Sequence, residues 1–516
     1  MTTEGRKTTV IDPLLPPARH HRLGPPLTGP AQEMIDSGFA LENADAPILH
    51  AGLNLADLAH VQDLYSRGVI PHAAAADLTR VLLLAVDTAP EDFPYDPAFG
   101  EPYNCRERHF TEQIGDTAGW LHAGRPRREA VRIALRLHVR DVLDDLIEAS
   151  TELVTSIAKL ATQHSRTLLP DQTYLQHAQP STFGHYVLSF AYPMLRDIER
   201  FVDAYGWTNA SPGGAGCVNG SRLMTDRGHI ANLLGFDSVI EHTRDAMWQV
   251  DGLIAMLSTA SSLLTTQSKL AEDLEIWASN EFDFVTIADG YSRASVLMPQ
   301  KRNPYALSIV RGASGILIGR LSGFLAVSKS PSARSDNLIY AYGEVPRALD
   351  LAIRTTRLSN GVIATLDVNV ERMRSALESG FGQSTDLAEY VMESCEVDYR
   401  TAYQIVGIAV RQASREGLRG VDLDGERLDR AAEQFRGTPL GLTGRDLTEI
   451  LDPARIVATR TVTGGAAPDL VEAMAKDCID KAAEYLTAVR ARRESIRVAE
   501  QDLLAASAAL IEGEPR

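Results

Sequence analysis

Apolar residues recur every three or four positions along much of the chain, which is the spacing of amphipathic helices. The longest such stretch runs from Arg127 to Leu169, contains neither glycine nor proline, and meets Pro170, which we expect to end the helix. A helix of about 40 residues is about 60 Å long. Helices of this length usually bury their apolar stripes against other long helices, so the pattern predicts an elongated helical bundle.

Further stretches show the same helical spacing, and strand signals are few and short. Helices are predicted over 183–205 with a kink at Pro193, over 245–279, after Pro304, from about Ile339, and from Pro468 to Ile511. In the last of these, we expect the basic residues of 490–497 to form a solvated face. The sequence therefore predicts an all-α fold whose long stripes also pack against sister chains.

Composition narrows the class of protein. The length of 516 residues suggests about three domains, and 44% hydrophobic with 23% charged residues excludes wholesale disorder. The net charge of −17 makes nucleic acid and anionic membranes poor partners. Four scattered cysteines without metal or disulfide spacing favour a reducing cytoplasm. No run of 18 apolar residues and no signal-peptide core occurs, so we expect no membrane segment.

Candidate chemistry concentrates in segment 288–304, which joins two predicted helices and reads ADGYSRASVLMPQKRNP. Its glycine and serines predict a mobile loop, and Lys301 and Asn303 are expected at the start of the following helix. A helix start presents free N–H groups and positive potential. With Lys301 and Asn303 it forms an anion site suited to a carboxylate or to a developing enediolate. The alternative interpretation is an ordinary helix cap on a surface loop.

The same segment resembles the signature loop of the fumarase/aspartase superfamily, because Ser295 stands three residues before Met298 in MPQKRNP. Other blocks resemble those of argininosuccinate lyase and occur in the same order from about Gly38 to Pro468. They read RERHFTEQIG, LHAGRPRREAV, TYLQHAQPSTFGH, SPGGAGCVNGSRLMTDR, LAEDLEIWASNEFDFV, GFGQSTDLAEYV and LDPARIVATRTVTGGAAP.

The resemblance implies a three-domain, mostly α-helical protomer in a homotetramer with a 20-helix core. Each active site is then drawn from three chains. It also implies β-elimination of an N-substituted aspartate, which releases fumarate and needs neither a metal nor an organic cofactor. The corresponding division is a proline-rich arm at 1–30, an N-terminal domain at 31–120, a central domain at 121–366 with signature loop 284–304, a C-terminal domain at 367–467, and an extra helix at 468–516.

By resemblance, Ser295 is the base that removes the proton beside a carboxylate, and Lys301 and Asn303 stabilise the resulting dianion. A serine needs a strongly positive, closed site to act as a base, and loop closure would exclude water. The resemblance also implies a set of substrate-binding residues: Arg127, Thr173, Gln179 and Met298.

The departures from the family pattern gather at this site. Tyr174 replaces a histidine, and Ser308 replaces the glutamate paired with that histidine, so Tyr174 is the candidate that protonates the leaving group. Tyr103 replaces another family histidine. If the segment is helical, His177 lies one turn from Tyr174 and is the alternative proton donor. A capped or solvated histidine is the other interpretation of His177.

Three further departures bear on the leaving group. Arg128 and Arg334 add positive charge, and Ile339 removes a polar partner, where the family holds a cationic guanidinium. Like charges disfavour that group, so an acidic or neutral amine, or another nitrogen group, fits better. The predicted function is a carbon–nitrogen lyase that releases fumarate, possible also in reverse. The alternatives are argininosuccinate lyase itself, in arginine synthesis, and a catalytically silent structural or partner-binding homologue.

Overall fold

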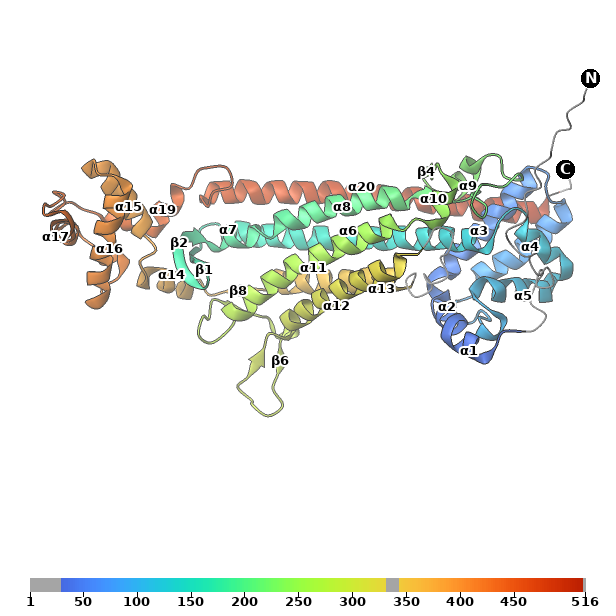
Figure 1. Cartoon of the computed structure of the whole chain (residues 1–516), viewed down its shortest axis with the longest axis horizontal. Coiled ribbons are helices and arrows are strands. Elements are labelled where there is room, and N and C mark those ends of the chain that lie inside the picture. The colour runs from blue at the N-terminus through green and yellow to red at the C-terminus, as the bar shows by residue number, and fades with distance from the viewer. Residues whose placement is uncertain (1–28, 331–342, 514–516) are drawn as a thin grey trace, which may run out of the picture.

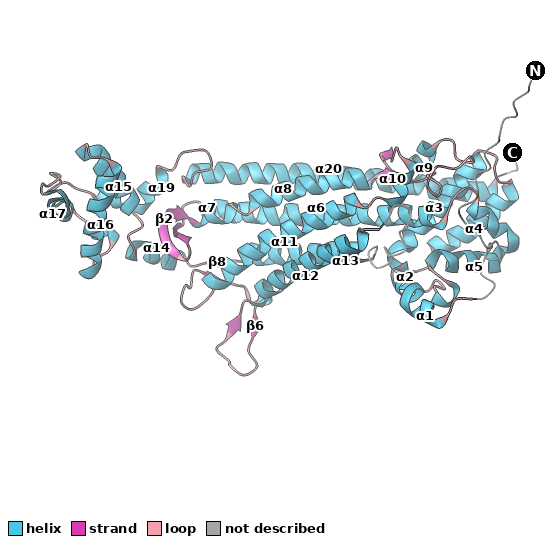
Figure 2. Cartoon of the chain, in the orientation of Figure 1, coloured by secondary structure: helices cyan, strands magenta, loops and turns pink. Residues whose placement is uncertain are grey.

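The computed structural model describes residues 29–330 and 343–513. Helices dominate these residues, and the few strands are short (Figure 2), which confirms the all-α prediction. The molecule is elongated, with a long bundle in the middle and a smaller helical group at each end (Figure 1). Most of the predicted arm, and both Arg334 and Ile339, lie outside the described residues.

The bundle is built around α6 (Arg127–Gln163), whose 37 residues extend over about 55 Å. It packs against α8 (Ala191–Thr208), α13 (Glu344–Ala364) and α20 (Pro468–Glu512). A second layer pairs α11 (Asp251–Trp277) with α12 (Tyr305–Ser328). The faces that meet carry the predicted apolar stripes, which are buried in one continuous core.

The prediction of one helix through residue 169 was wrong at its C-terminal end. Helix α6 stops at residue 163, and the chain continues into a β-hairpin of β1 (Leu168–Thr173) and β2 (Gln176–Thr182). The helix ends early because residues 164–167 turn back, and their carbonyl groups accept hydrogen bonds from the start of α7 (Phe183–Leu188). Pro170, which cannot donate to the ladder, lies inside β1.

The helical interpretation of the Tyr174–His177 segment was also wrong. Tyr174 and Leu175 form the hairpin turn, with φ of 55° and 59°, and His177 pairs across the ladder with Gln172. His177 is therefore on a strand and is not one helical turn from Tyr174. Two left-handed residues in succession make the turn that matches the twist of a hairpin.

Two other predicted helices are interrupted. The 183–205 helix breaks between α7 and α8, before Pro193, which lies in the first turn of α8 where a missing N–H costs little. The 245–279 helix divides into α10 (Thr243–Trp248) and α11. Helices α12 and α20 begin close to their predicted starts, whereas α13 begins five residues after Ile339.

The helical group at one end surrounds a second apolar core that includes Leu58, Leu78 and Phe110, each fully buried. A short π-helical turn separates its first two helices. The helices are α1 (Gln32–Met34), α2 (Ala40–Ala44), α3 (Ala46–Ser66), α4 (His72–Val86), α5 (Pro102–Ile114) and, between the bundle and this group, α9 (Arg227–Leu233).

The group at the other end has a separate core around Leu387, Ile405 and Leu428. Its helices are α14 (Val370–Ser379), α15 (Ser384–Cys395), α16 (Tyr399–Arg415), α17 (Gly425–Arg436), α18 (Thr448–Leu451) and α19 (Pro453–Ala458). Four small pairings complete the described strands: β1 with β2, β3 (Ala210–Ser211) with β4 (Ser238–Val239), β5 (Val285–Thr286) with β8 (Asp367–Val368), and β6 (Arg293–Ala294) with β7 (Arg302–Asn303).

Helix α20 returns along the whole bundle from this group to the first one (Figure 1). The prediction that its basic cluster is a solvated face was wrong for two residues. Arg492 pairs with the buried Asp144 of α6, and Arg493 donates to Asp145 at 2.6 Å and to Glu148 at 2.7 Å. These ion pairs join α20 to α6 midway along the bundle.

Helix α12 leaves several large apolar side chains exposed in the single chain. Its side chains at Tyr305, Ile309, Ile316, Ile318 and Leu325 are between 41% and 55% exposed. Its four glycines face open space, with no other described element close enough to contact an added methyl group. Within the described ranges, α12 is also the one helix whose length and composition would suit a membrane span, although the sequence suggested none.

Candidate active site

The signature loop is a hairpin that projects from the side of the bundle (Figure 1). Strands β6 and β7 pair in antiparallel fashion, and the Ser295 N–H donates to the Lys301 carbonyl at 3.2 Å. The Ser295 hydroxyl accepts a hydrogen bond from the Met298 N–H at 3.0 Å. Val296 and Leu297 at the tip are almost fully exposed. The loop therefore holds the serine oxygen at the base of an uncovered apolar tip.

Lys301 and Asn303 were predicted at the helix start, and this placement needs correction. Helix α12 begins at Tyr305, so both residues lie before it, Lys301 in the loop and Asn303 in β7. The Asn303 side chain donates to the Arg293 carbonyl at 3.3 Å. The chain stays extended here because β7 pairs with β6, and Pro304 then separates β7 from the helix.

Two hollows lie against this hairpin. One, of about 490 Å³, is lined by Ser295, Asn303 and the first turn of α12. The other, of about 600 Å³, is lined by Lys301 and the segment after α11. The structure thus brings the predicted base together with Asn303, while Lys301 lines the neighbouring hollow.

Arg127 lies far from that loop, at the first residue of α6. Its guanidinium donates to Asn104 at 3.2 Å and lies 3.6 Å from the carboxylate of the buried Glu101. Burial raises the pKa of Glu101, and burial together with Glu101 raises the pKa of Glu42 to about 7, against the opposing effect of Arg127 and Arg128. The guanidinium of Arg128 also lies over the Trp248 ring, 5.3 Å from its centroid.

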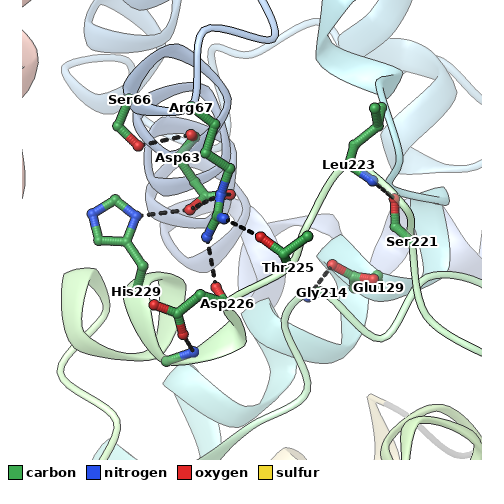
Figure 3. Close-up of polar contacts among 11 residues, drawn as sticks. Asp63, Ser66, Arg67, Glu129, Gly214, Ser221, Leu223, Thr225, Asp226 and His229 are labelled. Atoms are coloured by element: carbon green, nitrogen blue, oxygen red, sulfur yellow. Dashed lines mark hydrogen bonds and ion pairs between the residues drawn. The ribbon is translucent and has the colours of Figure 1, made fainter.

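The start of α6 is fixed by a buried acid that the sequence analysis missed. Glu129 accepts a hydrogen bond from the N–H group of Gly214 at 2.8 Å (Figure 3). It also accepts one from the N–H group of Gly216 at 2.6 Å. The segment after these glycines is held to α3, because Arg67 binds Asp63 and also donates to Thr225. An acid in a first helical turn is the signal that was available, but its partners are about 85 residues away.

The third group of predicted residues lies on the β1–β2 hairpin. Thr173, Gln179 and His177 are exposed, and the Tyr174 side chain at the tip is 99% exposed. A non-glycine residue in the left-handed region costs about 1–3 kcal/mol and is frequent at functional sites. The tip therefore presents an aromatic hydroxyl outward from the bundle, and no described residue forms a hydrogen bond with it.

These three groups do not meet within one chain. The Arg127 group lies at the N-terminal end of α6 and the Tyr174 hairpin follows its C-terminal end (Figure 1), so about 55 Å of helix separates them. A four-carbon dicarboxylate is far shorter than this distance. Of the predicted site residues, one chain places Ser295, Met298, Lys301 and Asn303 together and keeps Arg127, Arg128, Thr173, Tyr174 and Gln179 apart from them.

A carboxylate in the Ser295 hollow was also missed. The Ser308 hydroxyl donates to Glu275 at 3.3 Å, and Arg311 donates to the other carboxylate oxygen at 2.8 Å. By resemblance, Ser308 stands where the family has a glutamate. Glu275 supplies a carboxylate here from α11, 33 residues earlier in the chain.

Comparisons with known proteins agree over most of the length. A family model described as Lyase matches residues 57–319, and one described as Argininosuccinate lyase C-terminal matches 381–458. The chain is 33% identical over 474 residues to argininosuccinate lyase of Methanococcoides burtonii, covering 90% of this chain and 94% of that protein. It is 31% identical over 442 residues to argininosuccinate lyase of Methanothrix thermoacetophila, covering 85% and 88%.

Among solved structures, an EDDS lyase variant with bound fumarate superposes with a TM-score of 0.84 at 25% identity. The superposition covers 94% of this chain and 97% of that chain. These findings confirm the resemblance drawn from the signature loop and set aside the catalytically silent alternative. The chain belongs to the fumarase/aspartase superfamily as an argininosuccinate lyase-like member, and it is a fumarate-releasing carbon–nitrogen lyase.

Proposed function

We propose that the substrate is an N-substituted aspartate and that Ser295 is the base. The observation that carries the proposal is the hollow shared by Ser295 and Asn303 beside the start of α12. The serine oxygen already accepts a hydrogen bond from an N–H group, and such bonds favour a negative charge on the acceptor. A polar hollow with a fixed acceptor and an amide donor suits removal of a proton next to a carboxylate.

In the proposed reaction, Ser295 as an alkoxide takes the proton from the carbon next to a carboxylate. The negative charge that develops on that carboxylate is held by Lys301, Asn303 and loop N–H groups. The C–N bond then breaks, its electron pair leaves with the nitrogen, and fumarate remains. Where the leaving nitrogen is not already protonated, Tyr174 from a neighbouring chain supplies its proton. The reverse sequence adds an amine to fumarate.

We propose that the site is completed in a homotetramer. About 55 Å of α6 separates Arg127 from Tyr174 within one chain, and only association of chains can bring the two groups to one substrate. The exposed apolar side chains of α12, which lie on two sides of the helix, offer surface for a shared bundle of 20 helices. Light scattering should give about 225 kDa, four copies of the 56.2-kDa chain. A stable, active monomer would refute the shared site.

For the leaving group, we propose an acidic or neutral amine. By resemblance, Arg128 and Arg334 bring positive charge to the place where the family holds a guanidinium, and like charges oppose that group. Two like charges about 4 Å apart repel by about 1 to 4 kcal/mol, depending on the solvent between them. Argininosuccinate should then be a poor substrate. Direct assay of fumarate release should show faster turnover of adducts of acidic or neutral amines, whereas efficient turnover of argininosuccinate would favour argininosuccinate lyase itself, acting in the cytoplasm in arginine synthesis.

A further inference from the structure

Glu275 stands at the wall between the two hollows and lines both of them. Its side chain is 32% exposed, so it is within reach of a bound molecule. Among the described residues that line the Ser295 hollow, Glu275 is the one acid. The carboxylate is held in place from two sides, by the Ser308 hydroxyl and by the Arg311 guanidinium.

The local charge balance leaves this carboxylate negative. Arg311 is shared, because it also lies 3.2 Å from Glu272, one turn earlier on α11. Two carboxylates on one guanidinium leave a net charge of about −1 on this cluster. Arg293 also lines the Ser295 hollow, and its guanidinium lies 5.1 Å from the centroid of the Tyr305 ring. Two of the roughly four lone-pair positions of the Glu275 carboxylate are used by its neighbours, so positions remain for another donor. A negative acceptor therefore faces the hollow in which the reaction is proposed to occur.

That charge is unfavourable for the carboxylates of the substrate and favourable for its nitrogen. In an N-alkyl aspartate the nitrogen is a protonated, N–H-bearing ammonium, bonded to the carbon whose C–N bond must break. It is the part of the substrate that a fixed carboxylate would recognise. The carboxylates have other partners available, in Arg127, Lys301 and the N–H groups of the loop.

We propose that Glu275 binds the departing nitrogen, accepting a hydrogen bond from its N–H, and so selects substrates whose nitrogen is protonated. This inference rests on the proposed function and refines it. The amine is cationic at the nitrogen that leaves, while its distant part is acidic or neutral. Ser308 and Arg311 then hold Glu275 in orientation. The residue contacts the substrate nitrogen and transfers no proton.

The test uses binding, so that it does not depend on turnover. In the full-length Ser295→Ala protein, calorimetry compares N-methylaspartate with 2-methoxysuccinate, which has an uncharged ether oxygen in place of the ammonium nitrogen. Glu275→Gln should weaken N-methylaspartate binding by about tenfold or more, because the amide oxygen can still accept the N–H but no longer carries the charge that attracts the ammonium. The Kd of 2-methoxysuccinate should change less than about twofold, since it has no N–H to donate.

Glu272→Gln is the matched control, because it removes the same charge from the same guanidinium on the same helix but does not line either hollow. It should leave the ratio of the two Kd values unchanged. Glu275→Asp keeps the charge and should retain part of the preference for N-methylaspartate over 2-methoxysuccinate. This variant replaces Glu275→Gln in the test if the glutamine variant misfolds. An equal effect on both ligands, or an equal effect of both glutamine variants, overturns the role of Glu275. If neither ligand binds to any of these proteins, the proposed dicarboxylate site itself is overturned.

Discussion

Ser295 makes few contacts that its removal would disturb. Among the described residues, its hydroxyl forms one hydrogen bond, with the Met298 N–H of the same exposed loop, so Ser295→Ala should leave the melting temperature nearly unchanged. Fumarate release should fall by about 100-fold or more, the usual contribution of a positioned base. A steady-state assay on the accepted adduct, with thermal melting as the folding control, checks this. Near wild-type turnover would show that another group is the base.

Glu42 gives the site a predicted dependence on pH. Burial and Glu101 raise its pKa to about 7, so it loses its proton as pH rises through neutrality and then adds a negative charge beside Arg127 and Arg128. That charge opposes a dicarboxylate, so the KM for fumarate in the addition direction should increase between pH 6 and 8. Glu42→Gln should remove this part of the pH profile. A profile of the same slope in both proteins would show that Glu42 does not act on the binding arginines.

At the scale of single residues, the sequence was sufficient to identify site residues that are close together in the chain. It did not identify residues that only the fold brings to the site. Ser295, Lys301 and Asn303 are close in the chain, so the motif was sufficient to group them. Glu275 and Glu129 find their partners 33 and about 85 residues away. No periodicity or spacing connects such pairs, because tertiary packing alone brings them together.

Helix α20 is attached to the bundle by charges as well as by apolar packing. Arg492 pairs with Asp144, whose side chain is 1% exposed, and stacks 4.2 Å from the centroid of the Tyr205 ring. Arg492→Ala leaves that carboxylate without its cation, and we expect a loss of about 2–4 kcal/mol in the free energy of unfolding. Denaturant titration measures the loss.

The control is Arg497→Ala on the same helix. Arg497 pairs with Glu494 at the surface, three residues away, and exposed pairs of this kind are worth about 0–1 kcal/mol. Its unfolding free energy should stay close to that of the wild type. If the two variants unfold alike, the ion pairs between α20 and α6 do not stabilise the bundle.

At the scale of elements, apolar periodicity predicted the long helices because their stripes are buried in the bundle. It failed at the β1–β2 hairpin, whose turn is formed by Tyr174 and Leu175 in the left-handed region. Turns of this type usually carry Asn-Gly, so the sequence had no turn signal there. The segment before the turn pairs with the strand after it, so it forms a hairpin and not the helix that the apolar spacing indicated.

For the whole molecule, the elongated bundle was predictable from helix length, and the placement of the site residues at its separate parts was not. The three apolar cores agree with a division into an end group, a bundle and a second end group. The exact domain boundaries stay a prediction, as does the tetramer. The predicted extra helix at 468–516 contributes to two of these cores, that of the bundle and that of the first end group.

The central claim is that fumarate is released at sites to which more than one chain contributes. Mixing Ser295→Ala chains with Arg127→Ala chains, after denaturation and joint refolding, tests it most directly. Each variant alone should be nearly inactive. Random hybrid tetramers should regain up to about a quarter of wild-type activity, because one site in four then receives an intact Ser295 and an intact Arg127 from different chains. Hybrid oligomers that form but stay as inactive as the separate variants would contradict the account.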